Sequence, residues 1–360
     1  MTGEAMEKKR YFGPDLVRTV ACLFVLGVHF YLYTGFYDRP YQGTAMMISV
    51  PIRMALMTCV PLFMMLSGYL CVGKKWSAAY YRGFIPLLLS YGLCGIACVI
   101  FMHFNEGIPA GPLSIARRLL DFTAVPYGWY VEMYLGLFIL IPVINAGWNS
   151  LPRGGKKATL IALVILGIVP NVTNYTYQIF PDFWLALYPI AYYAAGAWIK
   201  ENPPKMKGIW LVAGWIVLSL AVCPLQYHLF KEANFTFSPT NYFYSLFVFG
   251  STYCLFAALV RVKGEKIPPA LKWCVSRIAR LSFCIYMLSY IGDALIYPCL
   301  CALIPQFDNI LIWHIPAVAV NLVLSALLAW AIEAVSGLIM KLFALCENKF
   351  TKKRIKASGE

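Results

Sequence analysis

The sequence predicts an all-α integral membrane protein, a bundle of about ten transmembrane helices with both termini cytoplasmic. Three observations predict this class: the composition, the length of the apolar segments and the distribution of basic residues. The chain has 360 residues, of which 61% are hydrophobic and 13% charged, compared with about 25% charged residues in a soluble domain. Nearly every stretch between charge clusters is apolar and about 20 residues long, which is the length that crosses a bilayer.

The apolar stretches divide the chain into spans and short loops. Helices rather than barrel strands are expected, because a helix satisfies its own backbone hydrogen bonds in lipid. The first span is interpreted as a retained helix, since it is too long for a signal peptide and has no small-residue cleavage site. We expect a cytoplasmic segment over 1–10, a ten-helix transmembrane domain over 11–340 and a basic cytoplasmic tail over 341–360. The predicted spans are 12–36, 45–71, 83–104, 128–149, 158–175, 183–199, 208–230, 241–260, 281–304 and 311–340.

The basic residues determine the predicted orientation. The chain has 30 Lys and Arg against 16 Asp and Glu, a net charge of +14. If the N-terminus is cytoplasmic, 24 of the 30 basic residues fall on the cytoplasmic side, and only Arg39, Arg117, Arg118 and Lys231 lie outside. Cytoplasmic loops of inner-membrane proteins carry such an excess. The charge therefore indicates a multi-pass protein of the cell inner membrane, surrounded by membrane lipids, and not a nucleic-acid partner.

The cysteines and histidines do not indicate a metal. None of the 12 cysteines forms a Cys-x-x-Cys pair, and most of them lie inside apolar segments. Neither a disulfide framework nor a zinc site is expected from this distribution. The sequence also has no Walker loop and no Gly-x-Ser-x-Gly elbow.

Ionisable residues inside predicted spans are costly in lipid, so each is a candidate functional residue. The set consists of Arg18, His29, Arg53, Glu132, Asp293 and Glu333.

Arg18 and His29 belong to the first span and are 11 residues apart. At 100° per residue they share one helix face, about 16 Å apart along the axis. Asp15 precedes Arg18 by three residues, where a helical pair forms. Two plainer readings stay open: Arg18 as an anchor that reaches toward the headgroups, and His29 as a partner in an interhelical hydrogen bond.

Depth counting places further polar residues near this pair. Arg53 lies close to the level of His29, and Glu132 lies just below the outer end of the fourth span. These two residues either take part in the chemistry or form a structural ion pair with each other. Arg82, at the cytoplasmic start of the third span, either binds phosphate or serves as a topology anchor. Ser67 is either a hydroxyl donor or a small residue that permits close helix packing.

A histidine close to arginines, with no evident nucleophile, suits acyl transfer by general base catalysis. The arginines would bind an anionic donor or stabilise an oxyanion.

The ordered motifs of the chain resemble those of the acyltransferase type 3 family, which are integral membrane O-acyltransferases. The resemblance spans nearly the whole chain and rests on Asp15-Leu-Val-Arg18 followed by His29, on Pro61-Leu-Phe-Met-Met-Leu-Ser-Gly-Tyr-Leu70, on Tyr81-Arg82 with Pro86, on Trp129-Tyr-Val-Glu132 with Ile141-Pro142, and on Ser282-Phe-Cys-Ile-Tyr286. The chain departs from the family at Ser289, where many members have a histidine. It resembles the stand-alone form, without a fused hydrolase-like domain.

The resemblance implies an acyl-CoA donor, usually acetyl-CoA, that enters from the cytoplasm. It implies a carbohydrate or lipid-linked acceptor hydroxyl, as in O-acetylation of cell-envelope polysaccharide, and no metal. His29 would be the catalytic base or a transient acyl carrier, with Arg18 as a further catalytic residue. Glu132 is added as a candidate catalytic residue from its depth rather than from the resemblance. The expected donor-binding residues are Arg18, Arg82, Ser67 and Tyr69. Arg53 and Trp129 are expected to support the acceptor or the transition state.

Two other functions are compatible with a polar face on one helix. The first is a transporter or flippase for an acylated or anionic envelope metabolite, but the sequence lacks the internal repeats that transporters often have. The second is a membrane sensor or scaffold. The sequence does not determine the acceptor, the acyl chain length or the oligomeric state.

Overall fold

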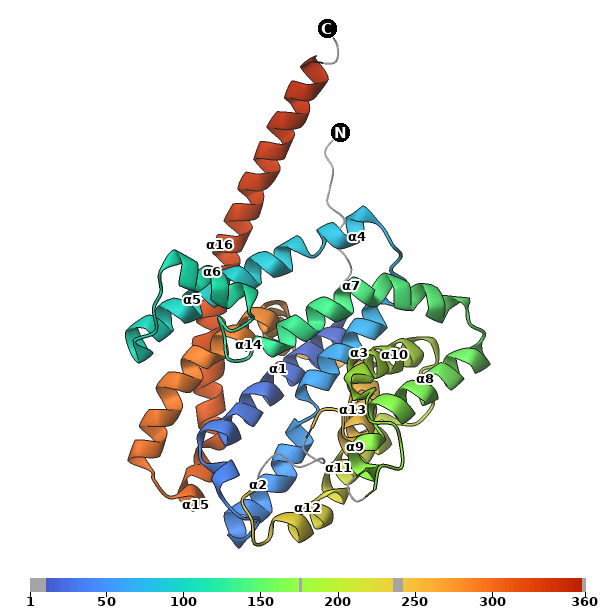
Figure 1. The fold of residues 1–360 in the computed structure, drawn as a ribbon, viewed down its shortest axis with the longest axis vertical. Coiled ribbons are helices and arrows are strands. Elements are labelled where there is room, and N and C mark those ends of the chain that lie inside the picture. The colour runs from blue at the N-terminus through green and yellow to red at the C-terminus, as the bar shows by residue number, and fades with distance from the viewer. Residues whose placement is uncertain (1–10, 175–176, 236–241, 358–360) are drawn as a thin grey trace.

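The computed structural model describes residues 11–174, 177–235 and 242–357, with side chains up to residue 342. The predicted segment 1–10 lies outside these residues. The described part is a helical bundle in which α1 runs through the centre, flanked by α3 and α14 (Figure 1). The helices are α1 (Phe12–Tyr33), α2 (Gly43–Leu56), α3 (Cys59–Cys71), α4 (Ala78–Arg82), α5 (Ile85–Glu106), α6 (Pro112–Leu120), α7 (Trp129–Ser150), α8 (Arg153–Gly167), α9 (Pro170–Thr173), α10 (Tyr188–Glu201), α11 (Gly208–Ala221), α12 (Cys223–Phe230), α13 (Leu246–Leu259), α14 (Pro269–Leu303), α15 (Phe307–Ile310) and α16 (His314–Ala357).

The all-α membrane class predicted from the sequence is confirmed. Within the described residues, eight helical segments are long and apolar enough to cross a membrane. The other two predicted spans, 183–199 and 241–260, contain α10 and α13, which have 14 residues each. A helix of that length extends about 21 Å, less than the roughly 30 Å of the hydrocarbon core. Both helices pack inside the bundle, and α10 is buried along most of its length.

The two ends of the chain's helical part lie on the same side of the molecule (Figure 1). Helix α16 has 44 residues and continues well beyond the bundle. The structure therefore joins the predicted last span and most of the predicted tail into one helix. Helix α14 likewise begins at Pro269, twelve residues before the predicted span.

The second predicted span is broken in the middle. Helix α2 ends at Leu56 and α3 begins at Cys59. Pro61 explains the break, because a proline lacks the N–H that would bond to the carbonyl of Met57 and its ring crowds that carbonyl. The break places Met57, Cys59 and Val60 along the wall of an internal cavity.

Helices α3 and α10 approach each other closely through two glycines. A Cβ on Gly68 would lie 1.8 Å from the Tyr193 carbonyl oxygen, and one on Gly196 would lie 1.8 Å from the Met65 carbonyl oxygen. No larger residue fits at either position without displacing backbone. Small residues are the usual means of such close packing between membrane helices. Gly68 therefore has the packing role that the sequence left open for Ser67 and its neighbours.

The connection between α5 and α7 folds back into the bundle. It contains the short helix α6, which packs against α5: the Tyr91 hydroxyl donates to the Leu119 carbonyl at 2.8 Å. Gly128 lies so close to the Phe122 carbonyl oxygen that a Cβ would be 2.0 Å from it. This turn carries Tyr127 to the centre of the bundle.

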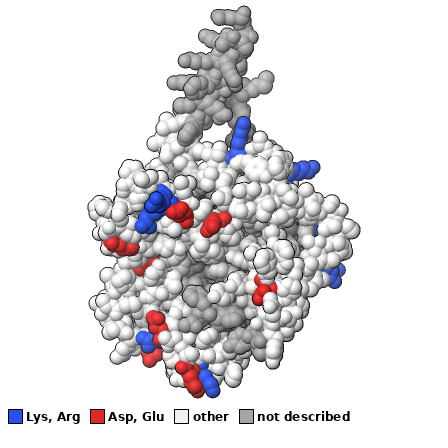
Figure 2. Space-filling model, in the orientation of Figure 1, with Lys and Arg blue, Asp and Glu red and all other residues white. Residues whose placement is uncertain are grey.

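The surface agrees with a lipid environment. Figure 2 shows a face that is mostly uncharged, with Lys, Arg, Asp and Glu in a few small groups. Large apolar side chains are exposed instead, such as Trp210 and Val217 on α11 and Leu327 and Trp330 on α16. Exposed apolar surface of this extent suits contact with the acyl chains of membrane lipids rather than with water.

Candidate functional site

Two cavities lie along one face of α1, and each contains one of the two polar residues predicted from that helix. The Arg18 cavity has a volume of about 250 Å³, and the His29 cavity has a volume of about 210 Å³. Val25, Val60 and Tyr286 line both cavities. The helical spacing that places Arg18 and His29 on one face therefore places them in two neighbouring chambers.

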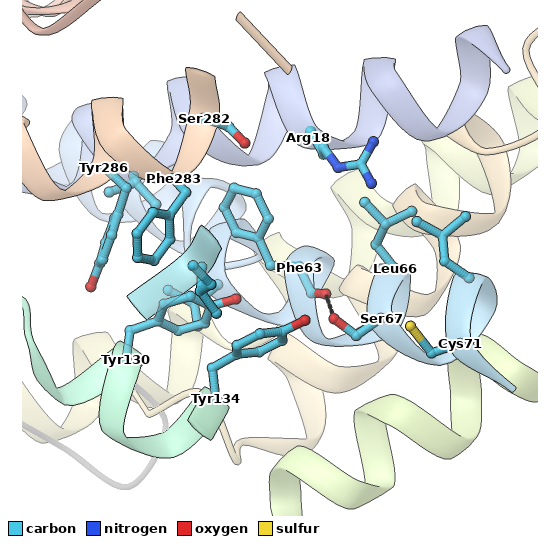
Figure 3. Close-up of a pocket in the computed structure, with 14 residues that line it drawn as sticks. Arg18, Phe63, Leu66, Ser67, Cys71, Tyr130, Tyr134, Ser282, Phe283 and Tyr286 are labelled. Carbon is cyan, nitrogen blue, oxygen red and sulfur yellow. Dashed lines mark hydrogen bonds between the residues drawn. The ribbon is translucent and has the colours of Figure 1, made fainter. Parts of the chain in front are cut away.

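The Arg18 cavity is apolar except near its cation. Figure 3 shows Arg18 above the cavity, with Phe63, Tyr130, Tyr134 and Phe283 around the space. The Arg18 Nη1 atom lies 3.0 Å from Asp15 Oδ1, so the predicted helical pair is present, and the arginine side chain stays 30% exposed. Ser67 also lines the cavity, and its hydroxyl donates to the Phe63 carbonyl at 2.9 Å.

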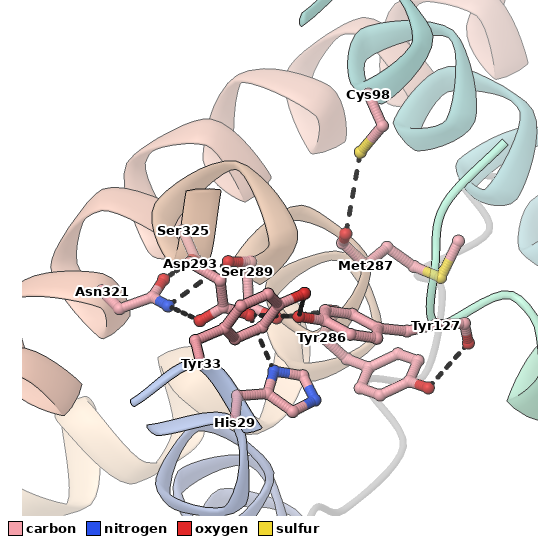
Figure 4. Close-up of polar contacts among 10 residues, drawn as sticks. All are labelled: His29, Tyr33, Cys98, Tyr127, Tyr286, Met287, Ser289, Asp293, Asn321 and Ser325. Carbon is pink, nitrogen blue, oxygen red and sulfur yellow. Dashed lines mark hydrogen bonds and ion pairs between the residues drawn. The ribbon is translucent and has the colours of Figure 1, made fainter. Parts of the chain in front are cut away.

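In the second cavity, His29 is paired with a carboxylate from another helix. His29 Nδ1 lies 2.9 Å from Oδ2 of Asp293 on α14, whose side chain is fully buried. The Tyr127 hydroxyl donates to the same oxygen at 2.5 Å, and Asn321 Nδ2 donates to Asp293 Oδ1 at 2.6 Å. Figure 4 shows these groups converging on Asp293.

Further groups hold the residues that contact Asp293. The Tyr33 and Tyr127 hydroxyl oxygens are 2.9 Å apart, and the Ser325 hydroxyl donates to Asn321 Oδ1 at 2.7 Å. A buried carboxylate is costly in a membrane protein, and a fully satisfied hydrogen-bond network is what makes it tolerable. The network therefore positions the carboxylate and, through it, the imidazole of His29.

The pairing assigns the two nitrogens of His29 different roles. Because a carboxylate accepts the hydrogen bond at Nδ1, that nitrogen carries the proton. Nε2 then has the lone pair, and within the described residues it has no hydrogen-bond partner. A histidine that a carboxylate orients in this way is suited to act as a general base.

Arg53 and Trp129 lie in the wall of the His29 cavity, and for Arg53 this agrees with its predicted depth. Arg53 is 2% exposed, and its Nε donates to the Tyr37 hydroxyl at 2.6 Å. Trp129 stacks on Phe243, with ring centroids 5.6 Å apart and planes inclined by 20°. The cavity thus combines a buried guanidinium with aromatic faces beside the histidine.

Three predicted residues lie outside both cavities. Glu132 is exposed on α7 and lines neither cavity. Arg82 is exposed at the end of α4. Tyr69 is half-buried, with Lys200 Nζ 5.7 Å from its ring centroid.

Sequence reasoning identified Asp293 as a costly carboxylate but assigned it no role, and it missed Tyr127 and Asn321. Asp293 carried a usable signal, since a buried carboxylate and a buried histidine are natural partners. Tyr127 lies in a loop and Asn321 is neutral, so neither stands out in the sequence. Ser289, where the family often has histidine, lies one turn before Asp293 and donates to the Tyr286 carbonyl at 2.8 Å.

The remaining titratable groups do not form a metal site. Within the described part of the chain, no three His, Cys, Asp or Glu residues gather in a way that could hold a metal ion. Glu333, the last ionisable residue of the predicted set, forms an ion pair with Arg280 at the bundle surface.

A multi-pass helical bundle with a carboxylate-oriented histidine in one of two adjoining cavities has the features of a membrane-embedded enzyme. The chain matches the family model of the type 3 acyltransferase domain over residues 11–332 and belongs to that family. No curated protein and no solved structure matches it. The protein is accordingly a membrane acyltransferase, and the resemblance noted from its motifs is confirmed.

Proposed function

We propose that the protein transfers an acetyl group from acetyl-CoA to a hydroxyl of a glycan, lipid-linked sugar or similar envelope acceptor. One observation carries this proposal: a single helix presents a cation to one cavity and a carboxylate-paired histidine to the next. The arrangement suits a reaction whose two substrates approach from opposite sides. The predicted orientation assigns the Arg18 cavity to the cytoplasm of the inner membrane, where CoA thioesters are made.

In the proposed reaction the donor enters the Arg18 cavity. The guanidinium of Arg18 attracts its anionic groups, while the apolar wall around Phe63 and Phe283 accommodates the uncharged arm that ends in the thioester. Ser67 lies beside this path. Arg82 precedes the cavity residue Leu87 by five positions, so we assign it to donor phosphates outside the cavity.

The acceptor occupies the His29 cavity. His29 Nε2 takes the proton of the acceptor hydroxyl, and the hydroxyl oxygen attacks the thioester carbonyl carbon. The carbon–sulfur bond breaks, the sulfur leaves with the electron pair, and the proton on Nε2 passes to it to form the CoA thiol. Asp293 accepts the hydrogen bond from Nδ1, which leaves the lone pair on Nε2, and it stabilises the imidazolium that forms.

Arg53 and Trp129 support the acceptor half of the reaction. A guanidinium in a nearly dry site interacts strongly with the oxyanion that develops on the carbonyl. The stacked rings of Trp129 and Phe243 offer an apolar face of the kind that packs against a sugar ring.

The test is transfer of radiolabel from [¹⁴C]acetyl-CoA to acceptors in inverted membrane vesicles of the native cells. His29→Ala is expected to reduce transfer by about 10²–10⁴-fold, the contribution of a general base. His103→Ala is the matched control, because His103 is exposed at the end of α5 and lines neither cavity. Mass spectrometry of envelope glycans, with and without the protein, then identifies the acceptor.

Two results would contradict the proposal. The first is full transfer by a His29→Ala protein that reaches the membrane in normal amount. The second is movement of a metabolite across the vesicle membrane that depends on His29 but consumes no acetyl-CoA, which would instead favour a transporter.

A further inference from the structure

The boundary between the two cavities consists of three side chains from three helices. Val25 comes from α1, Val60 from α3 and Tyr286 from α14, and only these three line both cavities in the described structure. They are 3%, 4% and 5% exposed, respectively. The side chains are therefore packed on every other side, and almost their whole free surface faces one cavity or the other. We call these three residues the partition.

The partition is held rigidly. The Tyr286 hydroxyl donates to the Tyr127 carbonyl at 2.8 Å, and its ring meets Tyr130 edge to face, with centroids 5.4 Å apart. Val25 and Val60 are β-branched and strongly prefer one χ1 rotamer in a helix. Val60 also lies between Cys59, the first residue of α3, and Pro61, whose ring fixes the local backbone. None of the three can move aside cheaply.

The partition lies between the two polar residues of α1. Val25 follows Arg18 by seven residues and precedes His29 by four, so it is about 10 Å from the first and about 6 Å from the second along the axis. In the proposed reaction the sulfur of the donor is on the Arg18 side, and the carbonyl carbon must come within reach of His29. The acyl group of the thioester therefore has to pass the partition.

We propose that Val25, Val60 and Tyr286 select the acyl chain length of the donor, admitting acetyl and rejecting longer chains. This inference rests on the proposed function. An acetyl group adds only a methyl beyond the carbonyl carbon. Each further methylene must either lie between the partition side chains or extend into the His29 cavity. That cavity has a volume of only about 210 Å³ and must also hold the acceptor.

The expected magnitude follows from the rigidity of the site. An apolar pocket discriminates one methylene by about 10- to 200-fold in kcat/KM. The wild-type protein is therefore expected to use propionyl-CoA at least about tenfold less efficiently than acetyl-CoA and to use butyryl-CoA less efficiently again.

The experiment changes the width of the partition by one or two methyl groups. Val60→Ala removes two methyls from it, and Val60→Ile adds one. Val99→Ala is the matched control, because Val99 on α5 is fully buried but lines neither cavity. Each protein is supplied with [¹⁴C]acetyl-, propionyl- and butyryl-CoA in inverted native vesicles, and the label on the membrane acceptors is counted.

We expect Val60→Ala to lower the acetyl-to-propionyl ratio by about tenfold, with Val25→Ala acting in the same direction. Val60→Ile is expected to raise the ratio, and Val99→Ala is expected to leave it unchanged. Because a ratio is measured within one preparation, a smaller amount of folded variant does not alter it. Val60→Ile preserves the apolar core, so it provides a second reading if Val60→Ala folds poorly.

The outcomes separate this inference from the proposed function. If transfer from every CoA thioester is unaffected by His29→Ala, the proposed function fails. If transfer requires His29 but the ratio is the same in all Val60 variants, or the wild type accepts butyryl as well as acetyl, the partition does not select the chain and only this inference is overturned.

Discussion

The Arg18 cavity and the His29 cavity obtain their polar groups in opposite ways. Arg18 is paired with Asp15, three residues earlier on the same helix, and the Ser67 hydroxyl bonds to a carbonyl four residues earlier. His29 is paired with Asp293, which is 264 residues away. Local helical geometry thus positions the polar groups of the first cavity, whereas those of the second cavity meet only when distant helices have packed together.

The two pairs also differ in their contact with solvent. The Arg18 and Asp15 side chains are 30% and 7% exposed, whereas those of His29 and Asp293 are 10% and 0% exposed. A partly exposed ion pair is screened and contributes little energy, while charges in a dry site interact strongly. The two carboxylates that contact polar residues of α1 therefore differ in effect: Asp15 belongs to a partly exposed ion pair, whereas Asp293 holds His29 in a buried site. The predictions below compare the two pairs.

The largest effect is expected for Asp293→Asn. The NH₂ group of the new asparagine can face either His29 or Asn321. If it faces His29, it donates to Nδ1, and the imidazole proton then lies on Nε2. If it faces Asn321, two NH₂ donors meet without an acceptor. Loss of the orienting carboxylate in a comparable triad reduces kcat by about 10⁴-fold, and we expect a reduction of similar order in acetyl transfer. Asp15→Asn is the matched control and should change the rate by only a few-fold. If the two substitutions reduce the rate of acetyl transfer equally, the buried pair has no greater role in catalysis than the partly exposed pair.

A smaller effect, on donor binding, is expected for Arg18→Ala. Removing one charged hydrogen-bonding group costs about 1.5–3 kcal/mol, so KM for acetyl-CoA should rise about 10- to 150-fold, with kcat changed much less. Arg18→Lys, which keeps the charge but not the planar fork, should restore part of the affinity. Initial rates over a range of acetyl-CoA concentrations measure both constants. A fall in kcat at unchanged KM would show that Arg18 acts in the chemical step and not in donor binding.

The smallest effect is expected for Tyr33→Phe. This change removes the hydroxyl that lies 2.9 Å from the Tyr127 hydroxyl but leaves the contacts of Asp293 in place. A neutral hydrogen bond contributes about 0.5–1.5 kcal/mol, so kcat should fall about 2- to 12-fold. Tyr80→Phe is the control, because its hydroxyl donates to the Phe138 carbonyl away from both cavities. If both variants have the same kcat, only the residues that contact Asp293 directly contribute to catalysis.

Much of the fold was predictable because lipid imposes simple rules on a sequence. Each of the ten predicted spans contains a helix, and the shared face of Arg18 and His29 follows from 3.6 residues per turn. The shortness of α10 was not predictable, because the residues that precede it, 183–187, are as apolar as the helix itself. The break at Pro61 was visible as a proline within a span, but membrane helices often tolerate proline.

The candidate site was predictable only where its residues share a helix. Arg18, His29 and Asp15 are placed by the period of α1, and the position of Arg53 follows from its depth in the bilayer. Depth alone was misleading for Glu132, since it specifies the level of a residue and not the direction in which its helix turns it. Arg82 and Tyr69 are likewise near the correct end of the bundle but outside the Arg18 cavity.

By itself, the sequence determined the membrane class, the family and the two polar residues that α1 carries on one face, because these depend on composition, motif order and helical period. The tertiary structure alone decided which carboxylate His29 meets, that the path along α1 is divided into two cavities, and which side chains divide it. The physical reason is that the rotation and register of α3 and α14 against α1 come from side-chain packing and close glycine contacts. These contacts join residues far apart in the chain and leave no periodic trace in the sequence.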